Sequence, residues 1–125
     1  MRKWLAFSGV FGFLAVASGA LGAHIIGDQL SIENLQRYET AVRYQMWHAL
    51  ALLAVAWLAA QSEIGTPWTI QVAGWAFTAG IVLFSGSLYA LSFTGERSLA
   101  AFAPVGGISL MVGWLALLAS AFRRR

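Results

Sequence analysis

The chain has 125 residues, of which 59% are hydrophobic and only 10% charged, and its formal net charge is +3. Soluble domains usually carry about 25% charged residues, so this composition excludes a soluble fold and indicates one domain of lipid-facing helices. The absence of cysteine excludes disulfides and thiolate metal sites.

The first predicted span covers residues 4–26, which contain no acidic residue, lysine or arginine. About 20 such residues are enough to cross roughly 30 Å of hydrocarbon. Small residues recur there at helical spacing, and three are predicted to let a neighbouring helix approach closely: Gly12, Gly19 and Gly22. The alternative is a cleaved signal peptide with a small-residue cleavage site at 18–20. The glycine stripe favours a span.

The second predicted element is one long helix over residues 32–60, capped by Ser31. Its first part is amphipathic and its second part is apolar on all sides. Two acid–base pairs at i,i+4 spacing support it: Glu33–Arg37 and Glu39–Arg43. At 1.5 Å per residue the helix is about 44 Å long, which exceeds the hydrocarbon core. We therefore predict an amphipathic segment over residues 32–43 at the interface and a span over residues 44–61.

A short turn with Gly65 and Pro67 separates this helix from the third span, predicted over residues 68–91. The third span contains no charged residue, and its polar side chains include Ser85 and Ser87. Polar groups at membrane depth usually find a hydrogen-bond partner on a neighbouring helix.

Pro104 suits the first turn of a helix and is predicted to open the fourth span, over residues 104–122. Gly106 and Gly113 belong to a second stripe of small residues, predicted to pack against a neighbouring helix. Together the elements predict an all-α fold: an integral membrane four-helix bundle with an amphipathic lead-in to helix 2. Residues 1–125 form a single four-span domain.

Four spans place both ends of the chain on the same side of a membrane. The basic residues at these ends are Arg2, Lys3, Arg123, Arg124 and Arg125. The positive-inside rule therefore predicts cytoplasmic termini for a multi-pass protein of the bacterial cytoplasmic (inner) membrane. We expect the ends to contact anionic lipid headgroups, and the terminal location of this charge argues against nucleic acid as a partner.

The six tryptophans fall into two groups by position. Those near predicted span ends are interpreted as interfacial anchors: Trp4, Trp47, Trp68 and Trp114. The remaining two, Trp57 and Trp75, lie deeper and are interpreted as packing residues.

Four passages resemble a known family. They are residues 18–24 (SGALGAH), 40–48 (TAVRYQMWH), 84–89 (FSGSLY) and 103–108 (APVGGI), the last followed by Gly113-Trp114. The chain resembles the domain of unknown function 423 family of small bacterial membrane proteins, which is related to the transmembrane protein 256 proteins. The resemblance covers nearly the whole chain. It implies a four-helix inner-membrane protein and no particular reaction.

The two histidines, His24 and His48, are predicted to lie at similar depth on antiparallel helices. The simplest interpretation is structural: each imidazole hydrogen-bonds a neighbour, and the candidate partners are Tyr44, Gln45, Ser85 and Ser87. A proton- or ligand-handling pair and a bis-histidine haem or metal site are the alternatives. Arg43 and Tyr44 are candidates for an anionic ligand, against a solvated arginine paired with Glu39.

No nucleophile–base arrangement or zinc-motif spacing is visible, so we predict no enzyme activity, no catalytic residue, no cofactor and no metal site. The first functional hypothesis is a structural, accessory or lipid-contacting scaffold. The second is a small oligomeric transporter or channel with a polar site at His24, Tyr44 and His48. The third is a bis-histidine redox carrier. A homo-oligomer or a membrane-protein partner suits a chain this small.

Overall fold

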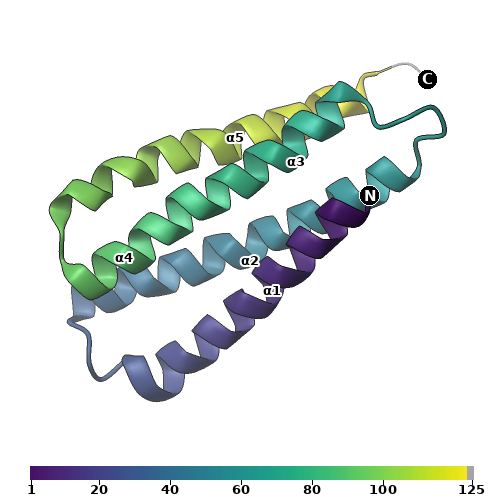
Figure 1. Ribbon diagram of the computed structural model, residues 1–125. Helices are drawn as coiled ribbons and strands as arrows, with labels where there is room; N and C mark the ends of the chain where they lie inside the picture. Colours follow the sequence, from purple (N-terminus) through teal and green to yellow (C-terminus); the bar gives the residue numbers. More distant parts are fainter. Residues whose placement is uncertain (124–125) are drawn as a thin grey trace.

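The computed structural model describes residues 1–123, and every regular element in that range is helical (Figure 1). The elements are α1 (Arg2–Leu21), η1 (Gly22–Ile26), α2 (Ile32–Ala60), α3 (Trp68–Gly80), η2 (Ile81–Ser85), α4 (Gly86–Thr94), η3 (Arg97–Ala101) and α5 (Phe102–Ala121). Here η1 and η2 are π-helical turns and η3 is a 3₁₀ turn. The predicted all-α class is confirmed.

Several of these elements follow one another without a break, so the described residues form four long rods (Figure 1). Three rods are long and apolar enough to cross a membrane: Arg2–Ile26, Trp68–Thr94 and Arg97–Ala121. The fourth rod is α2, whose N-terminal half carries the acidic and basic residues seen in the sequence.

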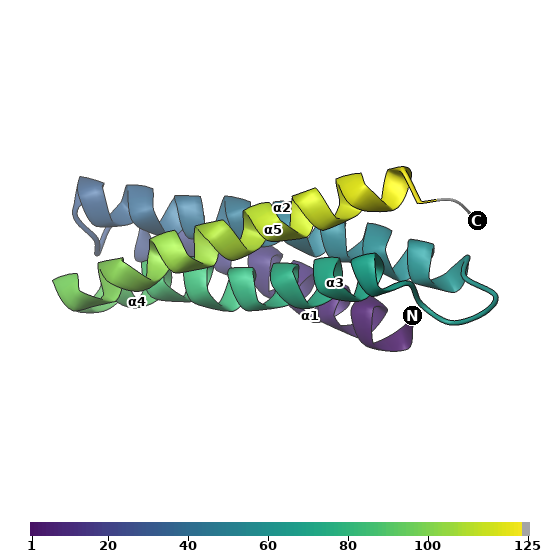
Figure 2. The same ribbon diagram turned by 90° about the horizontal axis from the view of Figure 1, so that it is seen from above.

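The rods pack side by side with their long axes roughly aligned (Figures 1 and 2). The most extensive contacts join α1 to α2 and α5 to α3, while α2 also packs along α3, η2 and α4. The start of α1, the α2–α3 connection and the end of α5 lie at the same end of the bundle (Figure 1). This end is called the terminal end below.

Side chains on α1 and α2 fix the register of these two helices. Ser8 Oγ donates to the Ala49 carbonyl at 2.8 Å, and Tyr38 donates to the Ser18 carbonyl at 2.5 Å. The stripe Gly12, Gly19 and Gly22 lies along α2, against Ala49, Val42 and Tyr38 respectively. The approach is tightest at Gly22, where an added Cβ would lie 2.7 Å from the Tyr38 ring.

The second glycine stripe lies where α5 crosses α3 and η2. A Cβ on Gly106 would meet the backbone of Phe84, 2.8 Å from its Cα atom, and one on Gly113 would lie 2.6 Å from the Phe77 ring. This close approach is possible only because neither position carries a side chain.

The helix boundaries differ from the prediction in two places. The helix of the fourth span begins at Phe102 rather than at Pro104, because η3 leads directly into it. Pro104 still lies in the first turn of α5, where its missing N–H leaves no hydrogen bond unmade. The rod of the third span ends at Thr94 rather than at residue 91, and Gly95, with φ +68°, is its C-cap.

Only part of the predicted polar pattern on α2 is present. Arg37 pairs with Glu33 at 2.7 Å as expected. The predicted Glu39–Arg43 pair is wrong, because Arg43 donates to Thr40 Oγ1 at 3.3 Å and the ion pair with Glu33 is the sole salt bridge among residues 1–123.

The predicted cap is present: Ser31 Oγ accepts the Asn34 N–H at 3.1 Å. We expect Ser31→Ala to destabilise the protein by about 1 kcal/mol, because an N–H at the start of α2 loses its acceptor. Unfolding in mixed micelles, followed by circular dichroism, measures this change. Ser98→Ala, at an exposed serine outside α2, is the control and is expected to leave the free energy of unfolding unchanged.

The anchor interpretation of Trp4 is wrong, because its side chain is fully buried. The ring packs edge-on against Phe7 and Trp75, with centroids 6.0 and 5.0 Å away, and Lys3 Nζ lies 4.7 Å from its centroid. Trp57 and Trp75, interpreted as packing residues, are more than half exposed. Thus Trp75 covers Trp4 with one edge and remains accessible on the other.

Candidate functional site

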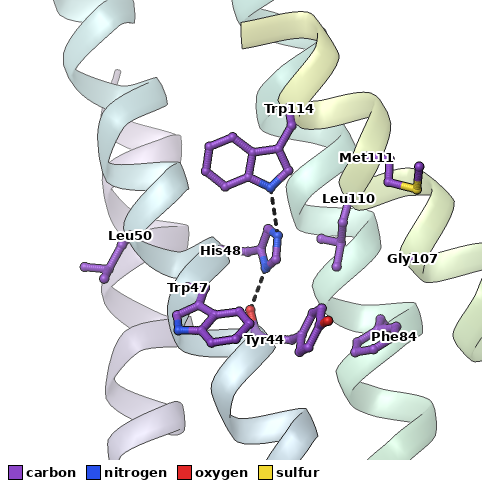
Figure 3. Close-up of a pocket in the computed structure, with 9 residues that line it drawn as sticks. All are labelled: Tyr44, Trp47, His48, Leu50, Phe84, Gly107, Leu110, Met111 and Trp114. Carbon is purple, nitrogen blue, oxygen red and sulfur yellow. Dashed lines mark hydrogen bonds between the residues drawn. The ribbon is translucent and has the colours of Figure 1, made fainter. Parts of the chain in front are cut away.

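A groove opens on the side of the bundle between α2, η2 and α5, and its volume is about 660 Å³ (Figure 3). We call it the α2–α5 groove. Its lining residues are mostly apolar and aromatic: Tyr44, Trp47, His48, Leu50, Phe84, Gly107, Leu110, Met111 and Trp114. Among the residues predicted from sequence as a polar site, Tyr44 and His48 are in this lining.

His48 is the polar centre of the groove. Its Nδ1 lies 2.7 Å from the Tyr44 carbonyl, one turn earlier in α2, and the Trp114 indole N–H donates to Nε2 at 3.0 Å (Figure 3). A carbonyl only accepts and an indole N–H only donates, so these two partners require the neutral tautomer with the proton on Nδ1. Both imidazole nitrogens are therefore occupied.

Aromatic rings surround the His48 side chain, which is only 5% exposed. The Tyr44 ring is stacked nearly parallel to the imidazole, with an interplanar angle of 19° and centroids 6.0 Å apart. Phe77 and Trp114 approach from the other helices at 5.6 and 5.8 Å. The imidazole is thus fixed in orientation by rings as well as by hydrogen bonds.

The π-helical turn η2 forms one wall of the groove. Such turns insert an extra residue into a helix and often occur at functional sites. Here Phe84 packs on Tyr44 with ring centroids 4.5 Å apart, and Ser85 donates to the Ala41 carbonyl at 2.8 Å. Consecutive residues of η2 therefore contact α2 through a ring and through a hydrogen bond.

The other predicted polar residues point elsewhere. Gln45 faces α1, where Nε2 donates to the Phe11 carbonyl at 2.9 Å while Oε1 accepts the Tyr89 hydroxyl at 2.7 Å. Ser87 donates to the Phe84 carbonyl within its own helical segment. Neither side chain lines the groove.

The prediction that the two histidines lie at similar depth is wrong, which removes the alternative of a histidine pair. His24 is exposed in η1, next to Gly22, which contacts Tyr38. Tyr38 and His48 are ten positions apart on α2, or about 15 Å along the helix. The imidazoles therefore cannot share a ligand or a haem. Arg43 is likewise exposed and outside the groove lining.

The contribution of α5 to this site is absent from the polar pattern of the sequence. Its groove residues, Gly107, Leu110, Met111 and Trp114, follow the i, i+3, i+4, i+7 spacing of a single helix face. That spacing identifies a face but not the helix opposite it. Trp114, predicted as an anchor, is about half exposed and donates its indole N–H to His48.

The chemical capacity of the groove follows from its lining. Within residues 1–123 no three histidine or acidic side chains gather as a metal-binding group. His48 and Trp114 are hydrogen-bonded to each other, so the surface available to a ligand in the groove is apolar and aromatic. Such a lining suits a hydrocarbon chain better than an ion.

The tautomer of His48 can be measured directly. Nitrogen-15 NMR of histidine-labelled protein in micelles is expected to show the Nδ1–H form for His48 at neutral pH. Trp114→Phe removes the donor to Nε2 while keeping a ring, so the His48 Nε2 resonance is expected to shift and the His24 resonances to stay in place. A dominant Nε2–H form in the unsubstituted protein would contradict the assigned hydrogen bonds.

Residues 18–107 match the family model described as protein of unknown function (DUF423). The UPF0382 membrane protein YwdK of Bacillus subtilis is 40% identical over 98% of both chains. A UPF0382 membrane protein of Staphylococcus saprophyticus is 38% identical over 98% of this chain and 99% of its own length. The UPF0382 inner membrane protein YgdD of Escherichia coli is 39% identical over 98% of this chain and 91% of its own length.

No solved structure matches significantly. The chain belongs to the DUF423 family and is an integral membrane protein.

Proposed function

We propose that this member of the DUF423 family is a four-span inner-membrane bundle that serves as a non-enzymatic, lipid-contacting scaffold. One observation carries the proposal: all but two of the buried polar side chains among residues 1–123 are bonded to one another or to main-chain carbonyls inside the bundle. A channel or transporter monomer needs polar groups that face a path and remain available to a solute.

Three serines illustrate this pattern. Ser8, Ser85 and Ser109 each donate to a carbonyl of a different helix, at 2.8, 2.8 and 2.7 Å. An unsatisfied polar group in hydrocarbon costs several kcal/mol, so these bonds are retained and join the helices. Gln45 of α2 bonds both to the Phe11 carbonyl of α1 and to the Tyr89 hydroxyl of α4, so one side chain joins three helices. Among residues 1–123, the buried side-chain polar atoms without a partner are Trp4 Nε1 and Thr69 Oγ1.

The fourth span of this proposal is α2. It lies between α1 on one side and the α3–η2–α4 rod on the other. Gln45 bonds to both of these neighbours, while His48 packs on Phe77 of α3 and bonds to Trp114 of α5. If the three apolar rods cross the membrane, the helix packed among them shares their depth. Both termini then face the cytoplasm, because Arg2, Lys3 and Arg123 lie at the terminal end and the sequence continues with two further arginines.

The α2–α5 groove gives the scaffold its lipid contact. It opens sideways, at the level of His48 and Trp114, well inside the two helices that carry them. In a bilayer this level is occupied by hydrocarbon, so the proposed occupant is an acyl chain of a membrane lipid. The exposed side chains of Trp47, Leu50 and Met111 provide the apolar surface for it.

Reconstitution in liposomes tests the scaffold. We expect no flux of protons, potassium or small organic solutes above that of empty liposomes at acidic, neutral or basic pH, with a channel-forming peptide as positive control. A flux present with the unsubstituted protein and lost in a stably inserted His48→Ala variant would overturn the proposal in favour of an oligomeric transporter.

A further inference from the structure

A second cavity, of about 440 Å³, lies at the terminal end of the bundle. It is open to one side and is bordered by the end of α2, the α2–α3 connection, the start of α3 and the end of α5. Its lining includes Glu63, Pro67, Thr69 and Arg123. We call it the terminal pocket.

Thr69 is the unusual member of this pocket. Its side chain is 2% exposed, and its hydroxyl Oγ1 has no hydrogen-bond partner among residues 1–123. A buried hydroxyl without a partner is costly, and a retained one requires an explanation. Elsewhere on these helices buried serine hydroxyls find carbonyl acceptors, as Ser85 and Ser92 do.

The backbone around Thr69 is equally short of partners. Thr69 is in the first turn of α3, which spans Trp68–Gly80. The first hydrogen bonds of this helix are those that Ile70 and Gln71 donate to the Pro67 carbonyl. The N–H groups of Trp68 and Thr69 precede these bonds and have no acceptor within the helix. Pro67 provides no side-chain cap. The start of α3 is thus an uncapped, partially positive helix end beside an unpartnered hydroxyl.

Two side chains of opposite charge complete the pocket. Arg123 and Glu63 both line it, and the sole salt bridge among residues 1–123 is elsewhere, between Arg37 and Glu33. A guanidinium, a hydroxyl and helix N–H groups suit a phosphate, whereas Glu63 disfavours a ligand that is only anionic. A zwitterion with a phosphate and an ammonium group satisfies both charges.

We propose that the terminal pocket binds the phosphoethanolamine headgroup of a membrane phospholipid, with the phosphate at Thr69, Arg123 and the start of α3, and the ammonium at Glu63. The inference deepens the lipid-contacting role and rests on the proposed topology, which brings the terminal end to the headgroup level. Free inorganic phosphate could occupy the same phosphate position and is the competing ligand.

Lipid binding to the delipidated full-length protein, followed by native mass spectrometry, tests the site. The probes are a phosphatidylethanolamine, a phosphatidylglycerol with the same acyl chains, and inorganic phosphate. We expect Thr69→Val and Arg123→Gln each to weaken phosphatidylethanolamine binding about tenfold, as loss of a hydrogen bond or charge to phosphate does. Arg97→Gln, at an exposed arginine at the opposite end, is the matched control and is expected to bind as the unsubstituted protein does.

Two further readouts separate binding from folding. Thr69→Val removes an unpartnered buried hydroxyl, so the lipid-free variant is expected to be at least as stable as the unsubstituted protein while binding lipid more weakly. Glu63→Gln is expected to abolish the preference for phosphatidylethanolamine over phosphatidylglycerol. Retention of both affinity and preference in all three variants would overturn the headgroup site.

Displacement of the lipid by millimolar inorganic phosphate, with the variants equally weakened toward phosphate, would overturn the lipid assignment in favour of free phosphate. The liposome flux experiment is independent of these outcomes. Solute flux would refute the scaffold and leave the pocket intact, whereas unchanged lipid binding would refute the pocket and leave the scaffold intact.

Discussion

Replacing Gly106 with alanine is expected to destabilise the bundle by about 3 kcal/mol, the upper range for overpacking a tight interface. The added methyl group would lie 2.8 Å from the Cα atom of Phe84, against the backbone of η2. A flexible side chain could rotate away from such a contact, but a main-chain atom cannot. The α5 helix would have to move outward from η2, which would also widen the α2–α5 groove.

Gly107 provides the matched control for this prediction. A Cβ there would meet only the Phe84 ring, at an ordinary contact distance of 3.8 Å. We expect Gly107→Ala to change the free energy of unfolding by less than about 0.5 kcal/mol. Unfolding of both variants in mixed micelles, monitored by tryptophan fluorescence and circular dichroism, measures the difference. Equal destabilisation at the two positions would mean that the Phe84 backbone is not close enough to Gly106 to exclude a methyl group.

The helical class was predictable because lipid leaves few alternatives. A chain with long uncharged runs must satisfy its backbone within helices, and the turns around Gly65 and Gly95 separate those runs. The π-turns η1 and η2 were not predictable, because they depend on packing between helices rather than on local propensity. Their effect is large: η2 places Phe84 in the groove and Ser85 against Ala41.

The error over the histidines has a specific physical origin. Treating residues 32–43 as an interfacial segment places His48 near the start of its span and opposite His24. In the structure this segment packs along α1: Tyr38 and Ala41 are buried, and Tyr38 bonds to Ser18. The register between α1 and α2 therefore differs by several turns from the predicted register, in which His24 lies opposite His48. Hydropathy measures how apolar a segment is, and it does not determine which residues of two helices lie opposite each other.

The polar residues near His48 and one of its partners, Tyr44, were identified from sequence, but its second partner was not. Tyr44 and His48 were singled out because polar groups beside an apolar run need explanation. Trp114, which supplies the hydrogen bond, is on α5, 66 positions from His48. Only the packing of α5 across α3 brings it there. The sequence contains both Trp114 and His48, but no pattern in it indicates that the two side chains are in contact.

Replacing His48 with alanine is expected to destabilise the protein by about 2 to 3 kcal/mol. The substitution removes a side chain that is 5% exposed and leaves the Trp114 indole N–H without its acceptor. His24→Ala is the control within the same chain, because that histidine is exposed in η1. It is expected to change the free energy of unfolding by less than about 0.5 kcal/mol.

A double-mutant cycle isolates the hydrogen bond from the loss of packing. Trp114→Phe keeps an aromatic ring on Phe77 and removes the N–H, so the coupling between His48→Ala and Trp114→Phe reports the interaction across the groove. We expect about 1 kcal/mol of coupling, within the range for interhelical hydrogen bonds in membranes. Strictly additive effects would mean that the bond does not hold α5 to α2. The groove would then be kept in shape by α5 packing on α3 and η2 alone, where Gly106 makes the closest approach.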